Sequence, residues 1–327
     1  MRTLVTKKYP LGLNQLINFS HDSLLSSASY TSRGFCYYNK NNYEDAIKDF
    51  NKALELKSDA VEALIGKAGC LSEMRLFEDS ISCIDEAINL DPNDYILWLN
   101  KALILGKAGK PQESLYWCDR VLQINDKLYQ VWKCKTAALI YMGNYEEALK
   151  CCNRAIELYP YDYENYKNKI ACLANLKELD QLEELNSYLR KVGEIKPAFN
   201  ELTQQVNELL EKLFVERAIN LNNEGKFTEA ITYCDKAISI NPNSDAAWDE
   251  KIFSLKSLGK IKEALDTANQ AIKTSPDLVR VWFSRGLLLA EMGQIDEAKN
   301  SLKRYIEIAP SSYEEVKMLA KKLISSL

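Results

Sequence analysis

The phrase KALEL at residues 52–56 decides the fold, because it recurs along the chain at a fixed interval. It returns as EAINL at 86–90, RAIEL at 154–158 and KAISI at 236–240. The step from Ala53 to Ala87 is 34 residues. A constant period between about 20 and 50 residues is the signature of a repeat array. The sequence therefore predicts a stack of similar units.

Other residue types recur with the same period and define a unit of 34 residues. Eight units start at residues 27, 61, 95, 129, 163, 211, 245 and 279. The fourth position of each unit holds a large residue: Tyr30, Leu64, Trp98, Trp132, Tyr166, Phe214, Trp248 and Trp282. Positions 4, 8 and 11 share one helical face, and positions 20, 24 and 27 share a face of a second helix. Each unit is therefore expected to be a helical hairpin.

This pattern resembles the tetratricopeptide repeat, a helix-turn-helix unit of 34 residues, over roughly residues 27–312. The resemblance implies an all-α fold, a right-handed superhelical solenoid of about eight repeats with a C-terminal capping helix. The fifth repeat is degenerate, since its alanine and proline positions hold Leu182, Leu189 and Glu194. One unit cannot bury its apolar face alone, so neighbouring units must stack.

The array is interrupted after the unit that starts at residue 163, because the next unit begins 48 residues later. The expected organisation is a non-repeat segment at 1–26, a first repeat block at 27–175, a degenerate half-repeat with a linker or long helix at 176–210, a second block at 211–312 and a capping helix at 313–327. Phe199, Leu202, Val206, Leu209 and Leu213 follow at spacings of three and four. They predict one helix from about 197 to 224, which packs on the preceding unit or dimerises.

The two ends of the chain are expected to be helical as well. Leu13, Leu16 and Ile17 predict a short helix that caps the first unit or lies in a groove of its own or another copy. At the C-terminal end, one side of the capping helix is expected to carry Val316, Leu319, Leu323 and Leu327.

Composition excludes several classes of function. The chain has 42 basic and 46 acidic residues, which disfavours a nucleic-acid partner. With one histidine and no nucleotide-binding or nucleophile motif, we expect no catalytic residue, no metal, no cofactor and no enzymatic activity. Nine cysteines without a CxxC pair are typical of a reducing compartment, and cysteines that recur by position are expected to fill the core. No stretch reaches the length of a signal peptide or membrane span, so we expect a cytoplasmic protein.

Position 7 is basic in every unit. The residues are Arg33, Lys67, Lys101, Lys135, Lys169, Arg217, Lys251 and Arg285. One interpretation is structural: each stem covers apolar surface and each charge meets an acidic neighbour or a carbonyl. The other is a row of cations that binds an anion. We call this set the basic ladder.

The resemblance implies that positions 2, 5, 9, 12 and 13 line a concave groove formed by the first helices. Position 9 contains no asparagine, which disfavours the carboxylate clamp known in the family. The groove residues expected here are mostly apolar: Phe35, Tyr38, Ile65, Leu99, Leu103, Lys133, Ile140, Lys167, Phe253, Lys256, Phe283 and Leu287. Lys133, Lys167 and Asp249 are expected to be isolated charges in it. Tight winding that hides these side chains is the alternative.

An exposed apolar strip of this kind usually marks an interaction site. The expected function is a scaffold or adaptor that binds a peptide or amphipathic helix of another protein. Self-assembly through the same groove and a role as regulatory subunit of an enzyme complex are the alternatives.

Overall fold

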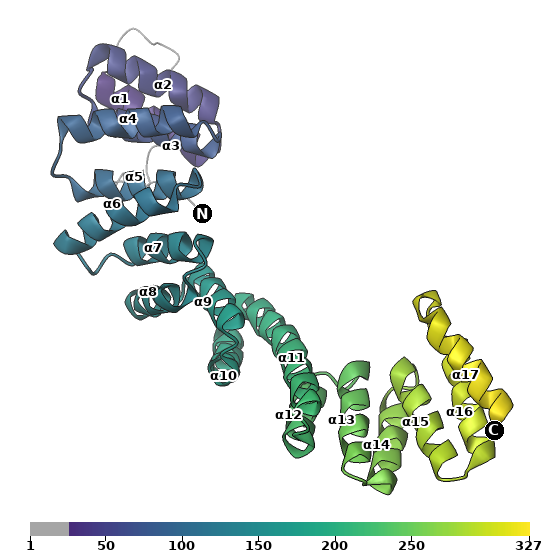
Figure 1. Ribbon diagram of the computed structural model, residues 1–327. Coiled ribbons are helices and arrows are strands. Elements are labelled where there is room, and N and C mark those ends of the chain that lie inside the picture. Colours follow the sequence, from purple (N-terminus) through teal and green to yellow (C-terminus); the bar gives the residue numbers. More distant parts are fainter. Residues whose placement is uncertain (1–25) are drawn as a thin grey trace. The chain divides into compact units, whose positions relative to one another are not determined.

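A computed structural model describes residues 26–327, and all of its regular secondary structure is helical (Figure 1). The chain divides into two compact units, which meet between Leu176 and Lys177. The fifth repeat is thus divided, with its first helix in unit 1 and its second helix in unit 2. The expectations for residues 1–25, including the short helix and His21, lie outside the described residues.

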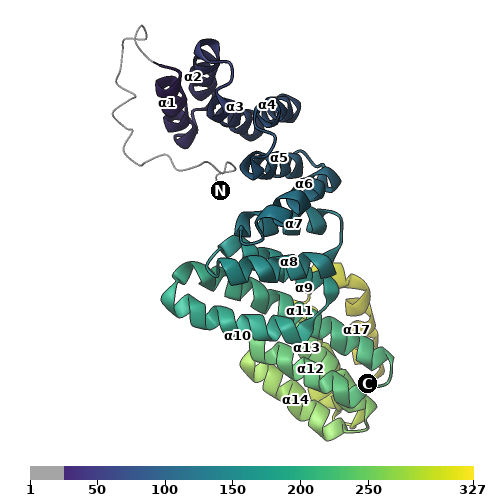
Figure 2. The same ribbon diagram turned by 90° about the vertical axis from the view of Figure 1, so that its left-hand side faces the viewer.

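Unit 1 contains four complete helical hairpins and one further helix. The hairpins are α1 (Ser27–Asn39) with α2 (Tyr43–Leu56), α3 (Val61–Glu73) with α4 (Phe77–Leu90), α5 (Tyr95–Lys107) with α6 (Pro111–Ile124), and α7 (Tyr129–Tyr141) with α8 (Tyr145–Leu158). The additional helix is α9 (Tyr163–Leu176). The two helices of each hairpin pack together, and each hairpin packs on the next (Figure 2).

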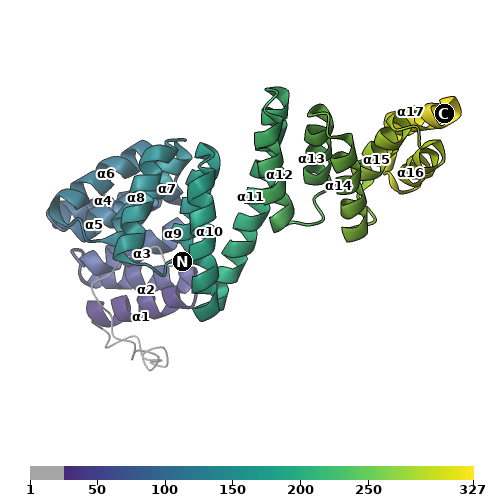
Figure 3. The same cartoon turned by 90° about the horizontal axis from the view of Figure 1, so that it is seen from below.

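Unit 2 begins with α10 (Leu179–Ile195), a short 3₁₀ turn (Pro197–Phe199) and the long α11 (Asn200–Asn223). Three hairpins follow, in which α11 pairs with α12 (Phe227–Ile240), α13 (Asp245–Ser257) with α14 (Ile261–Thr274), and α15 (Val279–Glu291) with α16 (Ile295–Ile308). A second 3₁₀ turn (Ser311–Tyr313) leads into α17 (Glu314–Ser326). Figure 3 shows the succession of α13 to α17.

The turns inside the hairpins use glycine where the backbone must become left-handed. Gly109, Gly143, Gly225, Gly259 and Gly293 all have φ between 74° and 76°. Glycine adopts this conformation without the steric cost of a Cβ atom, and it stops the first helix at the same place in each unit. The predicted tetratricopeptide hairpins are therefore confirmed by the helix positions.

The predicted long helix is confirmed, but the later part of its buried stripe is different. Phe199, Leu202 and Val206 are buried as expected. Further along, Leu210 and Phe214 are buried, whereas Leu209 and Leu213 are only half-buried. A straight helix with 3.6 residues per turn keeps residues four apart on nearly the same side, so the predicted seam drifts off the packed face. The buried stripe lies on the helix that packs against α10.

The C-terminal helix packs on α16 with a face slightly different from the predicted one. Ala320 is fully buried, and Leu323, Ile324 and Leu327 pack against the terminal core cluster. Val316 and Leu319 are exposed, contrary to expectation. The helix covers the last hairpin with its C-terminal half, because α17 contacts the stack on one side only.

Candidate functional site

The first helices of the hairpins form one layer in each unit. In unit 1, α1, α3, α5, α7 and α9 each contact the next member of the series, and in unit 2 so do α11, α13 and α15. Among helices in the described part of the chain, no two second helices pack as closely. A stack curves toward the side on which its members approach most closely. The first helices therefore lie on the concave side of each unit.

In unit 1, most apolar residues expected in the groove are packed between helices. Phe35, Tyr38, Ile65 and Leu99 are buried, and Leu99 has no exposed surface. The Phe35 ring meets the Phe50 ring edge-on, with centroids 5.1 Å apart. Leu103 and Ile140 are half-buried against neighbouring core clusters. The side chains of these six residues thus contribute mainly to packing between repeats.

The two lysines expected to be isolated in unit 1 have partners. The ammonium of Lys133 lies 2.9 Å from a carboxylate oxygen of Asp162, which is itself buried. Asp162 also accepts a hydrogen bond from the backbone N–H of Glu164, at the start of α9. Lys167 is exposed and lies 3.7 Å from Glu164 on its own helix. The expectation of isolated charges is therefore wrong at both positions, since acids near the start of α9 neutralise them.

In unit 2, the same face exposes apolar surface. Phe253 on α13 is 51% exposed, and its ring meets that of Phe227 at 6.3 Å. On the adjacent α15, Phe283 and Leu287 are half-buried. Lys256 is exposed and forms an ion pair of 2.7 Å with Glu291, which joins α13 to the end of α15. We call Phe253, Lys256, Phe283, Leu287 and the neighbouring Asp249 the α13–α15 face.

Asp249 is the charged residue of this face that the sequence analysis noted without assigning it a role. Its carboxylate accepts a hydrogen bond of 2.5 Å from the hydroxyl of Ser284 on α15. Burial raises the pKa of Asp249 to about 6, and the Ser284 hydrogen bond only partly opposes this shift. A carboxylate held in this way is incompletely compensated and is stabilised by an incoming cation.

A second acid of α13 fixes the start of α15. Asp245 accepts hydrogen bonds from the backbone N–H groups of Arg280 and Val281, at 3.0 and 3.4 Å. The N-cap residue of α15, Leu278, has no side-chain hydrogen bond to offer, so a residue of the preceding repeat caps the helix instead. Burial raises the pKa of Asp245 as well. These contacts hold α13 and α15 together beneath Phe253.

The basic ladder connects neighbouring repeats in both units. Lys101 pairs with Asp85 at 2.5 Å, Lys135 with Asp119 at 2.7 Å and Lys251 with Asp235 at 2.7 Å. Arg285 donates to Asn269 at 2.7 Å in the same arrangement. Arg33, in the first repeat, pairs with Asp49 of its own hairpin at 2.7 Å. These five charges face neighbouring helices.

The partner of the ladder is a second repeated position that the sequence analysis missed. Position 25 is acidic or an asparagine in every complete repeat that is followed by another repeat: Asn51, Asp85, Asp119, Asn153, Asp235 and Asn269. Each lies 16 residues before a ladder cation. The co-occurrence of the two positions is visible in the sequence, and could have predicted the contact.

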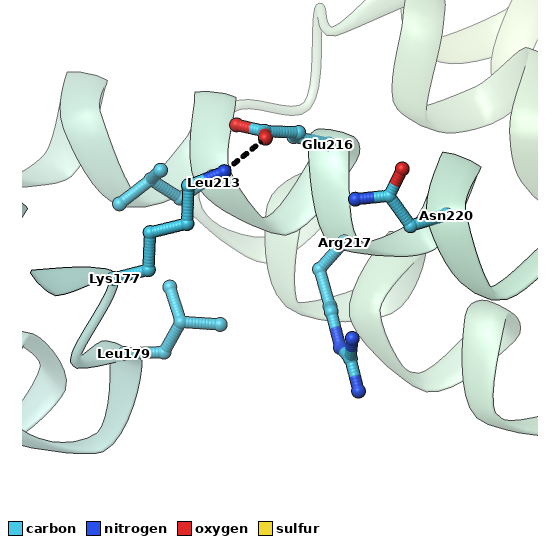
Figure 4. Close-up of a pocket in the computed structure, with 6 residues that line it drawn as sticks. All are labelled: Lys177, Leu179, Leu213, Glu216, Arg217 and Asn220. Atoms are coloured by element: carbon cyan, nitrogen blue, oxygen red, sulfur yellow. Dashed lines mark hydrogen bonds and ion pairs between the residues drawn. The ribbon is translucent and has the colours of Figure 1, made fainter.

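Arg217 is the exception in the ladder. The degenerate fifth repeat has Ser187 at position 25, and the hydroxyl of Ser187 donates to the carbonyl of Glu183 in its own helix. Arg217 is exposed, whereas the other seven ladder residues are half-buried. Its side chain lines a cavity of about 200 Å³ together with Lys177, Leu179, Leu213, Glu216 and Asn220 (Figure 4).

The cysteines are free thiols, and seven of the nine are buried. Burial raises the pKa of Cys70, Cys152 and Cys234 to about 12, so these thiols are protonated at neutral pH. Within residues 26–327, no group of three or more histidine, cysteine or acidic side chains is arranged to hold a metal ion. The described helices also include none that is long and apolar enough to cross a membrane.

Comparison with known families gives matches to tetratricopeptide repeat models along more than half of the chain. The matches cover residues 27–59, 71–128, 130–162, 213–244 and 279–312. No curated protein matches the sequence.

Solved structures that resemble the chain include three with low sequence identity. A tetratricopeptide repeat protein from Parabacteroides merdae is 11% identical, with 91% of this chain and 97% of that chain covered and a TM-score of 0.40. MamA from Desulfovibrio magneticus is 14% identical, with coverages of 53% and 96% and a TM-score of 0.45. Yeast Tom70 is 18% identical, with coverages of 94% and 65% and a TM-score of 0.39.

Proposed function

Because the chain belongs to the tetratricopeptide repeat family, we propose that it is a non-enzymatic protein-interaction scaffold whose docking site is the α13–α15 face. The exposure of Phe253 carries this proposal. Its ring is 51% exposed on the concave layer, at a position whose counterpart in the first repeat, Phe35, is buried. A large apolar side chain held open on a packed helix gains free energy when a partner covers it.

The partner that best fits this face is a peptide or amphipathic helix with an apolar side chain near a basic one. The apolar side chain would cover Phe253 and the half-buried Phe283 and Leu287. The basic side chain would pair with Asp249, whose carboxylate has Ser284 as its hydrogen-bond donor. Aromatic rings near a cation add a further attraction. Acid and apolar surface on one face together favour this combination over a purely apolar ligand.

The proposed location of this scaffold is the cytoplasm. Nine free cysteines, seven of them buried, are compatible with a reducing compartment. An adaptor role follows if the partner is itself part of a larger complex.

The experiment is a peptide-display selection on the full chain, followed by affinity measurements with the selected peptides by fluorescence anisotropy. We expect enrichment of peptides with Lys or Arg close to an aliphatic or aromatic residue. Phe253→Glu should weaken their binding at least tenfold, because it places a charge where the apolar side chain docks.

Met318→Glu is the matched control, since Met318 on α17 is exposed to a similar extent, 50%. It should leave the affinity unchanged. Equal loss in both variants, or selected peptides that bind Phe253→Glu normally, would refute the α13–α15 face as the site. Sedimentation equilibrium tests the alternative of self-assembly, which predicts an average mass that rises with concentration and falls in Phe253→Glu.

A further inference from the structure

The cavity beside Arg217 has a cause in the repeat pattern. Elsewhere an acid or asparagine at position 25 is available to receive the ladder cation of the next repeat. At the junction of α10 and α11 that position is Ser187, and within the described residues the guanidinium of Arg217 forms no hydrogen bond or ion pair. The nearby Glu224 feels its charge but is bonded to Lys226 at 2.7 Å. The cation is therefore available for an external partner.

The lining of the cavity combines two cations, one acid, one amide and two leucines. Figure 4 shows Lys177, Leu179 and Leu213 on one side and Arg217 and Asn220 on the other. Lys177 forms an ion pair with Glu216 along the edge. Lys177, Arg217 and Glu216 together leave one net positive charge, and the guanidinium and the Asn220 amide both provide N–H donors.

We propose that this cavity binds an aliphatic carboxylate. One negative charge matches the single net positive charge of the lining, and the guanidinium fork fits the two oxygens of a carboxylate. Leu179 and Leu213 supply apolar wall for a short aliphatic stem. The volume of about 200 Å³ corresponds to about seven water molecules of liquid, enough for a group the size of a glutamate side chain.

Two sources supply this chemistry: a glutamate side chain in a partner peptide, or a small free carboxylic acid. Both place a carboxylate against Arg217 and an aliphatic stem against the leucines. A phosphate dianion is disfavoured, because it would exceed the charge of the lining and leave Glu216 repelled. This site is separate from the α13–α15 face, and it stands or falls independently of the proposed function.

The test is an NMR titration of the full chain, in which the Nε–Hε resonances of arginine are followed during addition of sodium butyrate at constant ionic strength. The Arg217 resonance, assigned by its loss in Arg217→Met, should shift saturably at millimolar butyrate. Inorganic phosphate at pH 7.5 should bind at least threefold more weakly. The peptides acetyl-Ala-Glu-Ala-amide and acetyl-Ala-Gln-Ala-amide separate the sources: a shift with the glutamate peptide alone indicates a protein side chain, and a shift with butyrate alone indicates a free acid.

Variants make the test specific. In Arg217→Met, the butyrate affinity reported by the Asn220 side-chain amide should fall at least tenfold, while Lys262→Met, which removes an exposed lysine of α14, should leave it unchanged. Glu216→Gln raises the net charge of the lining and should narrow the preference over phosphate. No saturable shift with any carboxylate, or equal affinity in Arg217→Met, would overturn the proposal.

Discussion

The first-helix faces of the two units are built from the same repeat, yet they differ in what they expose. Leu99 in unit 1 is fully buried, whereas Phe253 in unit 2 is half-exposed. Both are at positions that line the concave side in this family. In unit 1, large apolar residues at successive repeats fill the space between first helices. In unit 2, Asp249 and Ser284 occupy that space, and the aromatic ring is left at the surface. The difference teaches that a repeat position defines a direction and that neighbouring side chains decide whether the residue is available to bind.

The largest expected effect follows directly from this contrast. Leu99→Glu places a carboxylate in a packed core and should lower the free energy of unfolding of unit 1 by about 4 kcal/mol. Phe253→Glu places one at the surface and should lower that of unit 2 by less than about 1 kcal/mol. Urea denaturation measures both effects, and hydrogen exchange assigns each to its unit. Equal losses would mean that the two faces are packed alike.

Local features of the structure were predictable from the sequence because they depend on residues close in the chain. The period of 34, the glycines with positive φ and the long helix after Pro197 all place helix boundaries. The exposure of Leu99 and Phe253 was not predictable in this way. It depends on how side chains of adjacent repeats fill the space between helices, and the same register position accommodates either result.

The candidate sites show the same division. Asp249 was recognised as a charge on the concave side, but its hydrogen bond to Ser284 and its raised pKa depend on the packing of α15 on α13. The ladder pairs could have been predicted from the recurrence of acid or asparagine 16 residues before each cation. The cavity at Arg217 could not, because Lys177 and Arg217 come together only through the packing of α10 on α11.

The second effect concerns Asp249 and depends on pH. Its folded pKa of about 6 lies above the model value of 3.8, so the folded state holds this proton more tightly than the unfolded state. The cost of ionising Asp249 is therefore absent below about pH 4, grows as the pH rises and is complete above about pH 6. Asp249→Asn keeps an acceptor for Ser284 and removes that cost. At pH 7.5 it should raise the stability of unit 2 by about 1–3 kcal/mol.

Thermal or urea unfolding of both proteins from pH 3.5 to 7.5 measures this difference. Their stabilities should converge near pH 3.5. A constant difference across the range would show that the effect comes from packing and that ionisation contributes nothing. Asp245→Asn serves as the comparison, because it removes a charge that caps the backbone N–H groups of α15 and should not produce the same gain.

The smallest effect compares the two kinds of ladder cation. Lys101→Met removes the partner of Asp85 and the cation that lies 4.6 Å from the centre of the Trp117 ring. Asp85 remains partly exposed and solvated, so the cost should be only about 1 kcal/mol in unit 1. Arg217→Met removes no internal partner and should change the stability of unit 2 by less than about 0.5 kcal/mol. Urea unfolding of the two variants beside the unmodified protein separates a cation that joins repeats from one that is free to bind. A destabilisation by Arg217→Met as large as that by Lys101→Met would place Arg217 among the structural cations, and would remove the reason for its different exposure.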